Sequence, residues 1–150
     1  MGEQYQGGHP RWILGSHAPG ADVWTDRFGI SVKSGKLTKG FLCISSYRLT
    51  RFSDLKEMKD FIDGSGKNFD MYLCCARTED SNGTRNYKIF SVSASIVEAK
   101  KMKWKESFSK KKGSSIGWHG EAQSGVVVDI HKSMSSQLWI KIPLKLCTQI

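Results

Sequence analysis

The stretch Phe41–Val97 constrains the fold most, because it reads as strand, helix, strand, tight turn and strand. Residues 41–50 are rich in β-branched and aromatic side chains and contain no Gly or Pro, which favours a half-buried strand. A helix is then predicted to begin at Ser53 or Asp54, because either side chain can accept a hydrogen bond from a first-turn N–H. Glu57 stands at the position that completes a capping box.

The predicted helix is amphipathic and ends at two glycines. Apolar side chains recur on one face at helical spacing, with lysines and aspartates on the other: Leu55, Met58, Phe61 and Ile62. Gly64 and Gly66 terminate the pattern. We therefore predict a helix over about 53–63, with Leu55, Met58 and Ile62 buried.

Two more strands and a tight turn complete this stretch. Residues 71–77 and 86–97 have the composition of strands. Asn82-Gly83 between them predicts a hairpin with a type I′ turn, because that turn needs positive φ at both central residues. We place the whole block at the middle of one α+β domain.

Alternating patterns predict further strands on both sides of this block. Phe28, Ile30 and Val32 alternate with smaller or polar residues, which suggests a first strand. Residues 126–131 and 138–146 alternate more regularly and are joined by a hairpin loop at 132–137. Pro143 lacks an N–H, so the last strand is either an edge strand or has its proline on an unpaired side.

Two segments read as loops. Ser34–Gly40 is a short basic loop that lacks the spacing of a phosphate-binding loop. Gly113–Gly120 reads as a flexible loop with an aromatic tip. These assignments rest on the abundance of Gly and Ser.

Together these signals predict an α+β protein with one domain. Its 150 residues suffice for one substantial core. We expect a mainly antiparallel β-sheet with one short helix at about 53–63 and room for a further short helix. The globular domain is expected over residues 23–150, after a flexible N-terminal arm over residues 1–22 that is rich in Gly.

The arm contains one apolar tripeptide, Trp12-Ile13-Leu14. It either clips the arm onto its own domain or contacts another chain. A clip needs no partner, but the flexible flanks would also let the tripeptide reach a neighbouring subunit. Trp12, Ile13 and Leu14 are therefore the candidate self-association residues.

Composition excludes several classes of protein. The sequence has no apolar run long enough to span a bilayer and no signal-peptide pattern, so we expect a protein that is not secreted. Gly2 leaves N-myristoylation open, although Gln6 departs from the usual motif. The four cysteines lack metal-site spacing, so we expect free thiols, no metal site and no cofactor.

No catalytic motif is specific enough to predict an enzyme. His119 beside Glu121 could form an acid–base pair, and His131 lies two residues from Asp129 on one face of a predicted strand. Both arrangements are common on protein surfaces, and no nucleophile motif accompanies them. We therefore expect a non-enzymatic protein.

The segment Lys100–Lys112 contains seven Lys and one Glu in 13 residues. A strand period fits it, because Met102 and Trp104 alternate with lysines, and a helical period fits it as well. We favour a short strand or extended segment that runs into a mobile loop at Lys110–Lys112.

Net charge points to polyanionic partners. The chain carries a formal charge of +9. A solvated charged face is the plain alternative, but seven cations with one balancing acid beside Trp104 and Phe108 favour a polyanion contact. The candidate polyanion-binding residues are Lys33, Lys36, Lys39, Lys100, Lys101, Lys103, Lys105, Lys110, Lys111 and Lys112.

Three motifs of the central block resemble the small matrix proteins of rhabdoviruses: Tyr47–Leu55, Phe69–Tyr72 and Tyr87–Phe90. In that family a strand leads through an arginine-containing link to a Ser-Asp helix start. A short helix, an aromatic-flanked Met-Tyr and a Tyr-Lys-Ile strand follow. The resemblance covers roughly residues 41–97 in detail. Elsewhere it extends only to the order of elements, including a late aliphatic strand pair over 125–146.

The resemblance implies an α+β protein that self-associates, condenses the viral nucleoprotein and bridges it to an anionic membrane through a basic surface. The sequence lacks the Pro-Pro-x-Tyr budding motif and the long Lys-rich N-terminal tail of the animal-virus proteins. We expect a matrix-type protein of the virion and host cytoplasm, peripheral to the membrane. Its expected partners are further copies of itself, viral nucleoprotein or RNA, and an anionic membrane surface.

The second hypothesis is an RNA-binding module, for example a viral silencing suppressor or accessory protein. Trp104, Phe108 and Trp118 stand among basic residues and could stack on bases. A simple RNA binder is expected to act as a monomer with a defined site size. A matrix-type protein is expected to associate and to prefer anionic vesicles.

Overall fold

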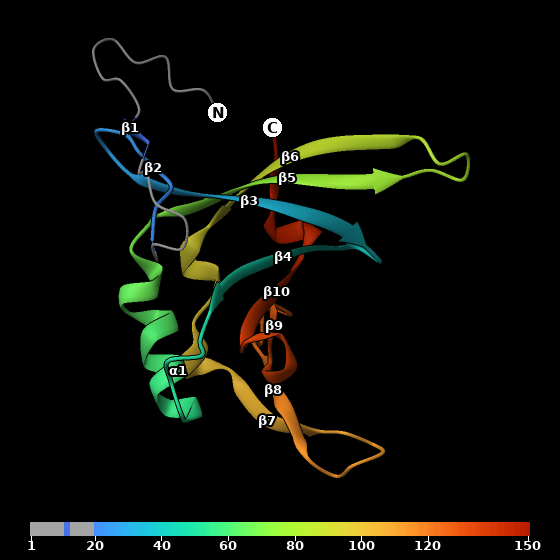
Figure 1. The fold of residues 1–150 in the computed structure, drawn as a ribbon. Coiled ribbons are helices and arrows are strands. Elements are labelled where there is room, and N and C mark those ends of the chain that lie inside the picture. Colours follow the sequence, from blue (N-terminus) through green and yellow to red (C-terminus); the bar gives the residue numbers. More distant parts are fainter. Residues whose placement is uncertain (1–10, 13–19) are drawn as a thin grey trace.

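A curved sheet and one α-helix packed against it make up an α+β fold (Figure 1). The structure is a computed structural model and describes residues 11–12 and 20–150. Within these residues the strand order is β11-β6-β5-β3-β4-β10-β9-β8-β7, with β2 joined to β3 and β1 joined to β2. The strands are Arg11–Trp12 (β1), Val23–Trp24 (β2), Gly29–Thr38 (β3), Phe41–Arg48 (β4), Met71–Glu79 (β5), Arg85–Ser93 (β6), Lys103–Phe108 (β7), Ser115–Glu121 (β8), Val127–His131 (β9), Gln137–Pro143 (β10) and Thr148–Gln149 (β11).

The sheet is mixed at one position. β3 and β5 run parallel, because β4 and α1 lie between them in the chain and carry it back to the same end of the sheet. The other strand pairs of the described residues are antiparallel. Short 3-10 turns connect the elements: Ser65–Lys67 (η1), Ala94–Ile96 (η2), Ala99–Lys101 (η3), Lys132–Met134 (η4) and Leu144–Leu146 (η5).

The helix α1 (Leu55–Asp63) begins where the capping signals predicted. Oδ1 of Asp54 accepts a hydrogen bond from the N–H of Glu57 at 2.8 Å, and the Glu57 carboxylate accepts one from the N–H of Ser53 at 3.2 Å. The two hydrogen bonds satisfy the first-turn N–H of Glu57 and the N–H of Ser53 just before the helix. Gly64 is the C-cap, as its position predicted.

Burial of the apolar face fixes α1 against the sheet. Met58, Phe61 and Ile62 are buried in a core that includes Leu42 and Ile140 from neighbouring strands. Leu55, predicted to be buried, is only half-buried at the start of the helix. The predicted strands before and after the helix are confirmed as β4, β5 and β6, except that the strand expected over 86–97 ends at Ser93 and the chain continues as the 3-10 turn η2.

The hairpin between β5 and β6 is confirmed, but its predicted turn type is wrong. Gly83 has φ of +79°, whereas Asn82 is not among the described non-glycine residues with positive φ, so a type I′ turn is excluded. Instead, Oδ1 of Asp80 accepts hydrogen bonds from the N–H groups of Asn82 and Thr84, each at 2.9 Å. The aspartate side chain therefore organises the turn.

The expected basic loop at Ser34–Gly40 is mostly strand. β3 continues to Thr38 and pairs with both β4 and β5, so that only Lys39 and Gly40 form the turn. Lys39 and Gly40 both have positive φ, at 49° and 81°. Pairing on both sides satisfies the β3 backbone and outweighs the local preference of Ser and Gly for loops.

The expected flexible loop at Gly113–Gly120 is also wrong over most of its length, because it forms β8. Two of its glycines make room for neighbouring groups. A Cβ at Gly117 would overlap the carbonyl oxygen of Ile130, and a Cβ at Gly120 would lie 2.8 Å from the Trp104 ring. These glycines permit close packing of a strand.

The C-terminal strands follow the predicted alternation, with one correction. β9 and β10 form an antiparallel pair, but β10 ends at Pro143, and the expected continuation to 146 is the 3-10 turn η5. β10 lies between β4 and β9, so it is not an edge strand. Pro143 pairs with Phe41 beyond the last residue paired to β9, so its missing N–H costs no ladder bond on that side.

The lysine-rich segment divides into three parts. Ala99–Lys101 forms η3, Lys103–Phe108 forms β7 as the favoured strand reading predicted, and Lys110–Lys112 lies in the turn before β8. The Asp63 carboxylate at the end of α1 accepts hydrogen bonds from the N–H groups of Ala99 at 2.6 Å and Lys100 at 2.8 Å. This contact joins η3 to α1.

The N-terminal arm is described only in part. Arg11–Trp12 pairs with Val23–Trp24 in the same chain, and Asp22 accepts hydrogen bonds from Ser31 and from the N–H of Val32. Ile13 and Leu14 lie outside the described residues, so their proposed contact with another chain stays a prediction. In the described part of the chain, no helix is long and apolar enough to cross a membrane.

Candidate polyanion-binding surface

One face of the sheet carries a row of side chains that runs from β6 to β7. Directly paired residues of adjacent strands project to the same face, so the strand registers define the members of the row. We call it the basic row, and its members are Tyr87, Arg77, Lys36, Cys43, Lys141, Val127, Glu121 and Lys103.

Cations dominate the basic row. Arg77, Lys36, Lys141 and Lys103 are all exposed, and Glu121 is the acid among its members. Arg77 and Lys36 are paired on adjacent strands, whose backbones lie about 5 Å apart. Lys105 projects to the same face, because it pairs with His119 in the neighbouring row. The row therefore presents a line of positive charge across the sheet.

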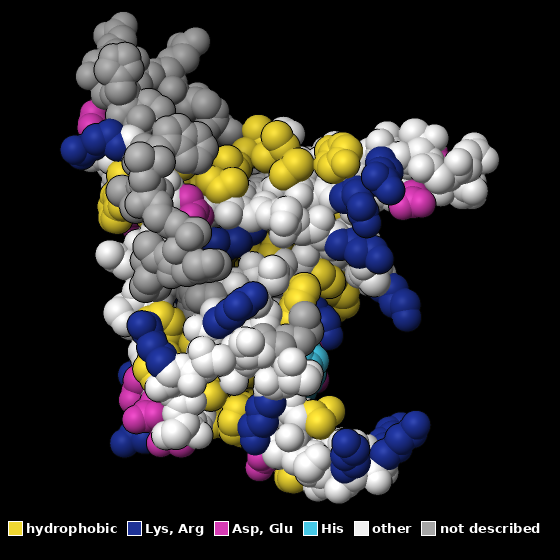
Figure 2. Space-filling view, viewed as in Figure 1, with side chains coloured by type: hydrophobic (Ala, Val, Ile, Leu, Met, Phe, Trp, Pro, Cys, Tyr) yellow, Lys and Arg dark blue, Asp and Glu magenta, His cyan; other side chains and the backbone are white. Residues whose placement is uncertain are grey.

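Figure 2 shows where cations gather on one side of the molecule. Lys and Arg side chains gather on the right of the view, over the strand ends near the β5–β6 hairpin and over the β7–β8 hairpin, on either side of a hollow. Lys36 and Arg77 line an open depression at the β5 end, which Glu79 and Asp80 also border. The positive charge of Lys36 and Arg77 at the β5 end attracts polyanions.

A hydrogen-bonded charge network lies beside the basic row. Nδ1 of His119 is 2.6 Å from Oδ1 of Asp129, and Nε2 of His119 is 3.0 Å from Oε1 of Glu121. Nζ of Lys141 donates to Oδ2 of Asp129 at 2.9 Å. Asp129 thus partly neutralises the positive charge of Lys141. Lys36, Arg77, Lys103 and Lys105 form no ion pair with the described residues.

The network shifts pKa values in both directions. Hydrogen bonding to Glu121 and to Asp129 raises the pKa of His119, although burial opposes the shift. Hydrogen bonding to His119 lowers the pKa of Glu121. Burial favours the neutral form of Asp129, but hydrogen bonds from Lys141 and His119 outweigh it and lower the pKa of Asp129. The network therefore favours the protonated form of His119 and the ionised forms of both acids.

The structure divides the predicted polyanion-binding lysines. Three are paired with acids and lie outside the basic row: Nζ of Lys33 is 3.6 Å from Asp22, that of Lys100 is 3.1 Å from Asp60, and that of Lys101 is 2.5 Å from Glu98. Lys36, Lys103 and Lys105 project to the basic face, and Lys39 lies in the turn after β3. Lys110, Lys111 and Lys112 are exposed at the end of the β7–β8 hairpin.

Sequence reasoning missed Arg77, Lys141 and Tyr87. Each stands in a strand that was correctly predicted, but its place beside Lys36 depends on which strands pair and in which register. Strand alternation could have shown which face of its own strand each occupies. No local signal in the sequence reports the order β6-β5-β3-β4-β10.

Two of the aromatic side chains expected to stack on bases are already engaged. Nε1 of Trp104 donates to the carbonyl oxygen of Ala99 at 2.7 Å, and its ring packs against Gly120. The ammonium of Lys132 lies 4.4 Å from the centre of the Trp118 ring. Phe108 is 55% exposed and Tyr87, in the basic row, is 63% exposed. Among the described side chains, Tyr87 and Phe108 are therefore exposed aromatic rings that lie near basic residues.

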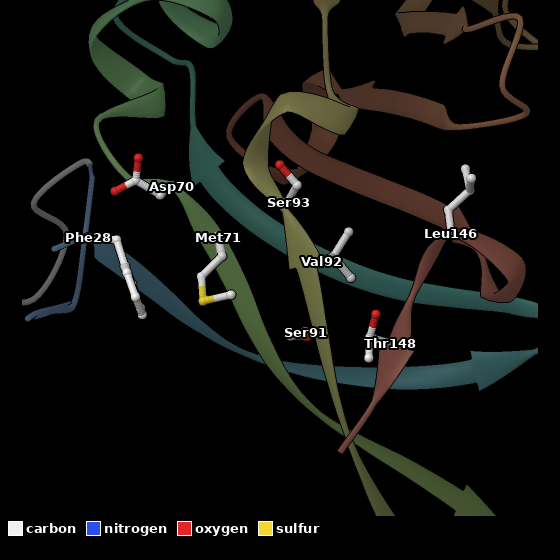
Figure 3. Close-up of a pocket in the computed structure, with 8 residues that line it drawn as sticks. All are labelled: Phe28, Asp70, Met71, Ser91, Val92, Ser93, Leu146 and Thr148. Carbon is white, nitrogen blue, oxygen red and sulfur yellow. The ribbon is translucent and has the colours of Figure 1, made fainter. Parts of the chain in front are cut away.

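A shallow pocket between β5, β6 and η5 offers no catalytic arrangement (Figure 3). Phe28 and Met71 line one part of it, with Leu146 and Thr148 across β6. Its one carboxylate, Asp70, already accepts a hydrogen bond from the N–H of Gly29 at 2.8 Å. That contact gives Asp70 a structural role.

The cysteines are separate thiols, and the described residues contain no cluster of His, Cys, Asp and Glu side chains suited to a metal ion. Cys74 is buried in the core, and burial raises its pKa to about 12. Burial also raises the pKa of Cys43, although Lys141 and Lys36 on either side in the basic row oppose the shift. The thiols of Cys74 and Cys43 are thus held in the neutral form.

Comparison with known proteins found no matching family model, no similar curated protein and no similar solved structure.

Proposed function

We propose that this is a non-enzymatic structural protein of the viral matrix type, which self-associates and links a nucleoprotein to an anionic membrane. The basic row carries the proposal. Lys36, Arg77, Lys103 and Lys105 stand exposed on one face of the sheet without ion-pair partners among the described residues, which suits contact with an extended polyanion.

The mechanism is electrostatic. Lys36, Arg77 and Lys103 would displace counterions from RNA phosphates, and each cation near an anionic membrane contributes about 1 kcal/mol. Self-association would multiply such weak contacts into avidity. The three motifs that resemble rhabdovirus matrix proteins lie in or beside β4, α1, β5 and β6, which include the β5 and β6 part of the basic row.

Self-association through Trp12, Ile13 and Leu14 is part of this proposal. The β1–β2 pairing would anchor the tripeptide at Trp12, from where Ile13 and Leu14 could reach a neighbouring subunit. Substituting Ile13 and Leu14 by Ser is expected to reduce association measured by light scattering against protein concentration. Association equal to that of the unsubstituted protein would favour an intramolecular clip.

An RNA-binding module is the second candidate, and Tyr87 favours it. Its ring is largely exposed next to Arg77 in the basic row, an arrangement that could stack one base while the guanidinium holds a phosphate. Filter binding at low protein concentration separates the candidates. A module would bind RNA as a monomer with a defined site size, whereas a matrix-type protein would associate and bind anionic vesicles.

The test of the basic row is the salt dependence of RNA binding. Replacing Lys36, Arg77 and Lys103 by Gln should reduce the slope of log K against log salt by about two for single-stranded RNA, because each phosphate contact contributes about 0.7. Filter binding over a range of salt concentrations measures the slope.

A control variant carries the same change in net charge away from the basic row. It replaces Lys56, Lys100 and Lys101 by Gln; Lys100 and Lys101 are paired with Asp60 and Glu98. The control should keep the original slope. Equal losses in both variants would mean that net charge alone governs binding, and the basic row would lose its role.

A further inference from the structure

The end of the β7–β8 hairpin exposes two large apolar side chains. Phe108 is 55% exposed and Ile116 is 41% exposed. The register shifts by one residue between Ser107 and Phe108, which makes Ile116 the extra residue opposite Phe108. Two apolar groups thus lie next to each other in the ladder, at an end of the sheet where the core does not cover them.

Three cations extend from the same hairpin end. Lys110, Lys111 and Lys112 are exposed in the turn, which closes through the Ser109 N–H donating to the Ser114 carbonyl at 2.8 Å. No acidic residue occurs between Ser107 and Gly120 in the sequence. The nearest acid along β7, Glu106, is 3.5 Å from Lys132. The hairpin end therefore combines exposed apolar area with uncompensated positive charge.

This combination matches the boundary of an anionic bilayer. Lysine stems can lie along apolar surface while their ammonium groups contact lipid phosphates or carboxylates, and Phe and Ile side chains can enter the acyl boundary. RNA would use the lysines and could stack on Phe108, but it offers nothing apolar to the aliphatic Ile116. Charge and apolar exposure together favour a lipid surface.

The exposed Phe108 and the lysines of β7 that belong to the basic face lie on opposite faces of the strand. Along β7, Lys103 and Lys105 project to the basic face, and by strand alternation Phe108 projects to the opposite one. A bilayer held at Phe108 would leave Lys103 free to contact RNA. This placement suits a protein that joins two polyanionic partners.

We propose that Phe108, Ile116 and Lys110–Lys112 form a lipid-contact element that docks the protein on anionic bilayers. The proposal deepens the matrix-type function proposed above and rests on it for its biological role. Its chemistry can be tested without reference to RNA.

The test is co-sedimentation of the full chain with vesicles of phosphatidylcholine, with and without phosphatidylserine. The double variant Phe108→Ser/Ile116→Ser should bind the phosphatidylserine vesicles at least about tenfold more weakly, because its apolar contact is lost. Replacing Lys110, Lys111 and Lys112 by Gln should weaken binding by roughly a hundredfold, because each lysine near an anionic surface contributes about fivefold or more. Vesicles of phosphatidylcholine alone should bind weakly.

The matched control is Ile89→Ser/Ile150→Ser. Ile89 and Ile150 lie outside the β7–β8 hairpin, and their side chains are 45% and 56% exposed. The control should bind vesicles like the unsubstituted protein, and circular dichroism should show every variant folded. Vesicle binding by Phe108→Ser/Ile116→Ser that equals the control overturns the proposal. The proposal is also overturned if Phe108→Ser/Ile116→Ser loses RNA binding but keeps vesicle binding, because the hairpin end would then be a base-stacking element.

The two proposals can fail separately. Loss of vesicle binding in the hairpin variants supports the lipid-contact element, whatever the basic-row variant does. If the basic-row variant then binds RNA with an unchanged salt slope, the link to nucleoprotein fails while the lipid-contact element stands.

Discussion

Nδ1 of His119 in β8 lies 2.6 Å from Oδ1 of Asp129 in the adjacent strand β9. The same imidazole reaches Glu121 through Nε2, and the other oxygen of Asp129 accepts a hydrogen bond from Lys141. Because Lys141 and Glu121 belong to the basic row, the protonation of His119 changes the charge beside the proposed polyanion site.

The first prediction concerns stability against pH. The pKa of His119 is raised above its ordinary 6.5, so its contribution is fully present below pH 6.5 and is lost as pH rises through the folded-state pKa. Urea denaturation across this range should give a falling midpoint. His119→Gln should remove that fall, while His131→Gln, which changes the other histidine of this face, should keep it. An identical fall in His119→Gln would assign the pH dependence elsewhere.

The second prediction compares two positions of α1. Met58 is 2% exposed in the core, so Met58→Ala should lower the free energy of unfolding by about 2–5 kcal/mol through loss of burial and the cavity left behind. Leu55→Ala should cost less, because Leu55 is only half-buried. Chemical denaturation measures both. Equal costs would indicate that the first turn packs more tightly than the structure describes.

The central block was predictable because its signals are local. Asp54 and Glu57 cap the helix through neighbouring residues, and Gly64 ends it within one turn. These interactions depend on spacing in the sequence alone. The same holds for the existence of the β5–β6 hairpin, although Asp80 set a turn that the Asn-Gly signal did not predict.

The two segments that were read as loops but form strands have a common physical cause in long-range packing. Gly117 and Gly120 were read as flexible, but each faces a group from another element, the Ile130 carbonyl and the Trp104 ring. Ser34 was read as loop, but it pairs with Cys75 of β5, and from Gly35 onward β3 pairs with β4 as well. The basic row is a long-range property in the same sense. Lys36 was identified as a cation, whereas its neighbours Arg77 and Lys141 required the register.

The third prediction concerns the contact between α1 and η3. Asp63→Ala removes the acceptor for the N–H groups of Ala99 and Lys100, which should cost about 1–3 kcal/mol. Asp60→Ala is the matched control, because its ion pair with Lys100 is largely exposed and should contribute less than about 1 kcal/mol. Denaturation midpoints compare the two. A larger cost for Asp60→Ala would contradict the role assigned to Asp63.

The last prediction tests why β8 contains glycine. Gly117 has φ of +148°, and a Cβ there would overlap the Ile130 carbonyl oxygen, so Gly117→Ala must displace β9 or distort β8. We expect a loss of about 3 kcal/mol or more in the free energy of unfolding.

Gly113→Ala in the turn of the same hairpin is the control. Its φ of +62° is also positive, but no heavy atom would lie within 4 Å of the new Cβ, so only backbone strain of about 1–2 kcal/mol is expected. Thermal and chemical denaturation should therefore rank Gly117→Ala far below Gly113→Ala. Equal losses in the two variants would contradict this explanation. They would mean that position 117 requires glycine for its backbone conformation and not for the close approach of β8 to Ile130.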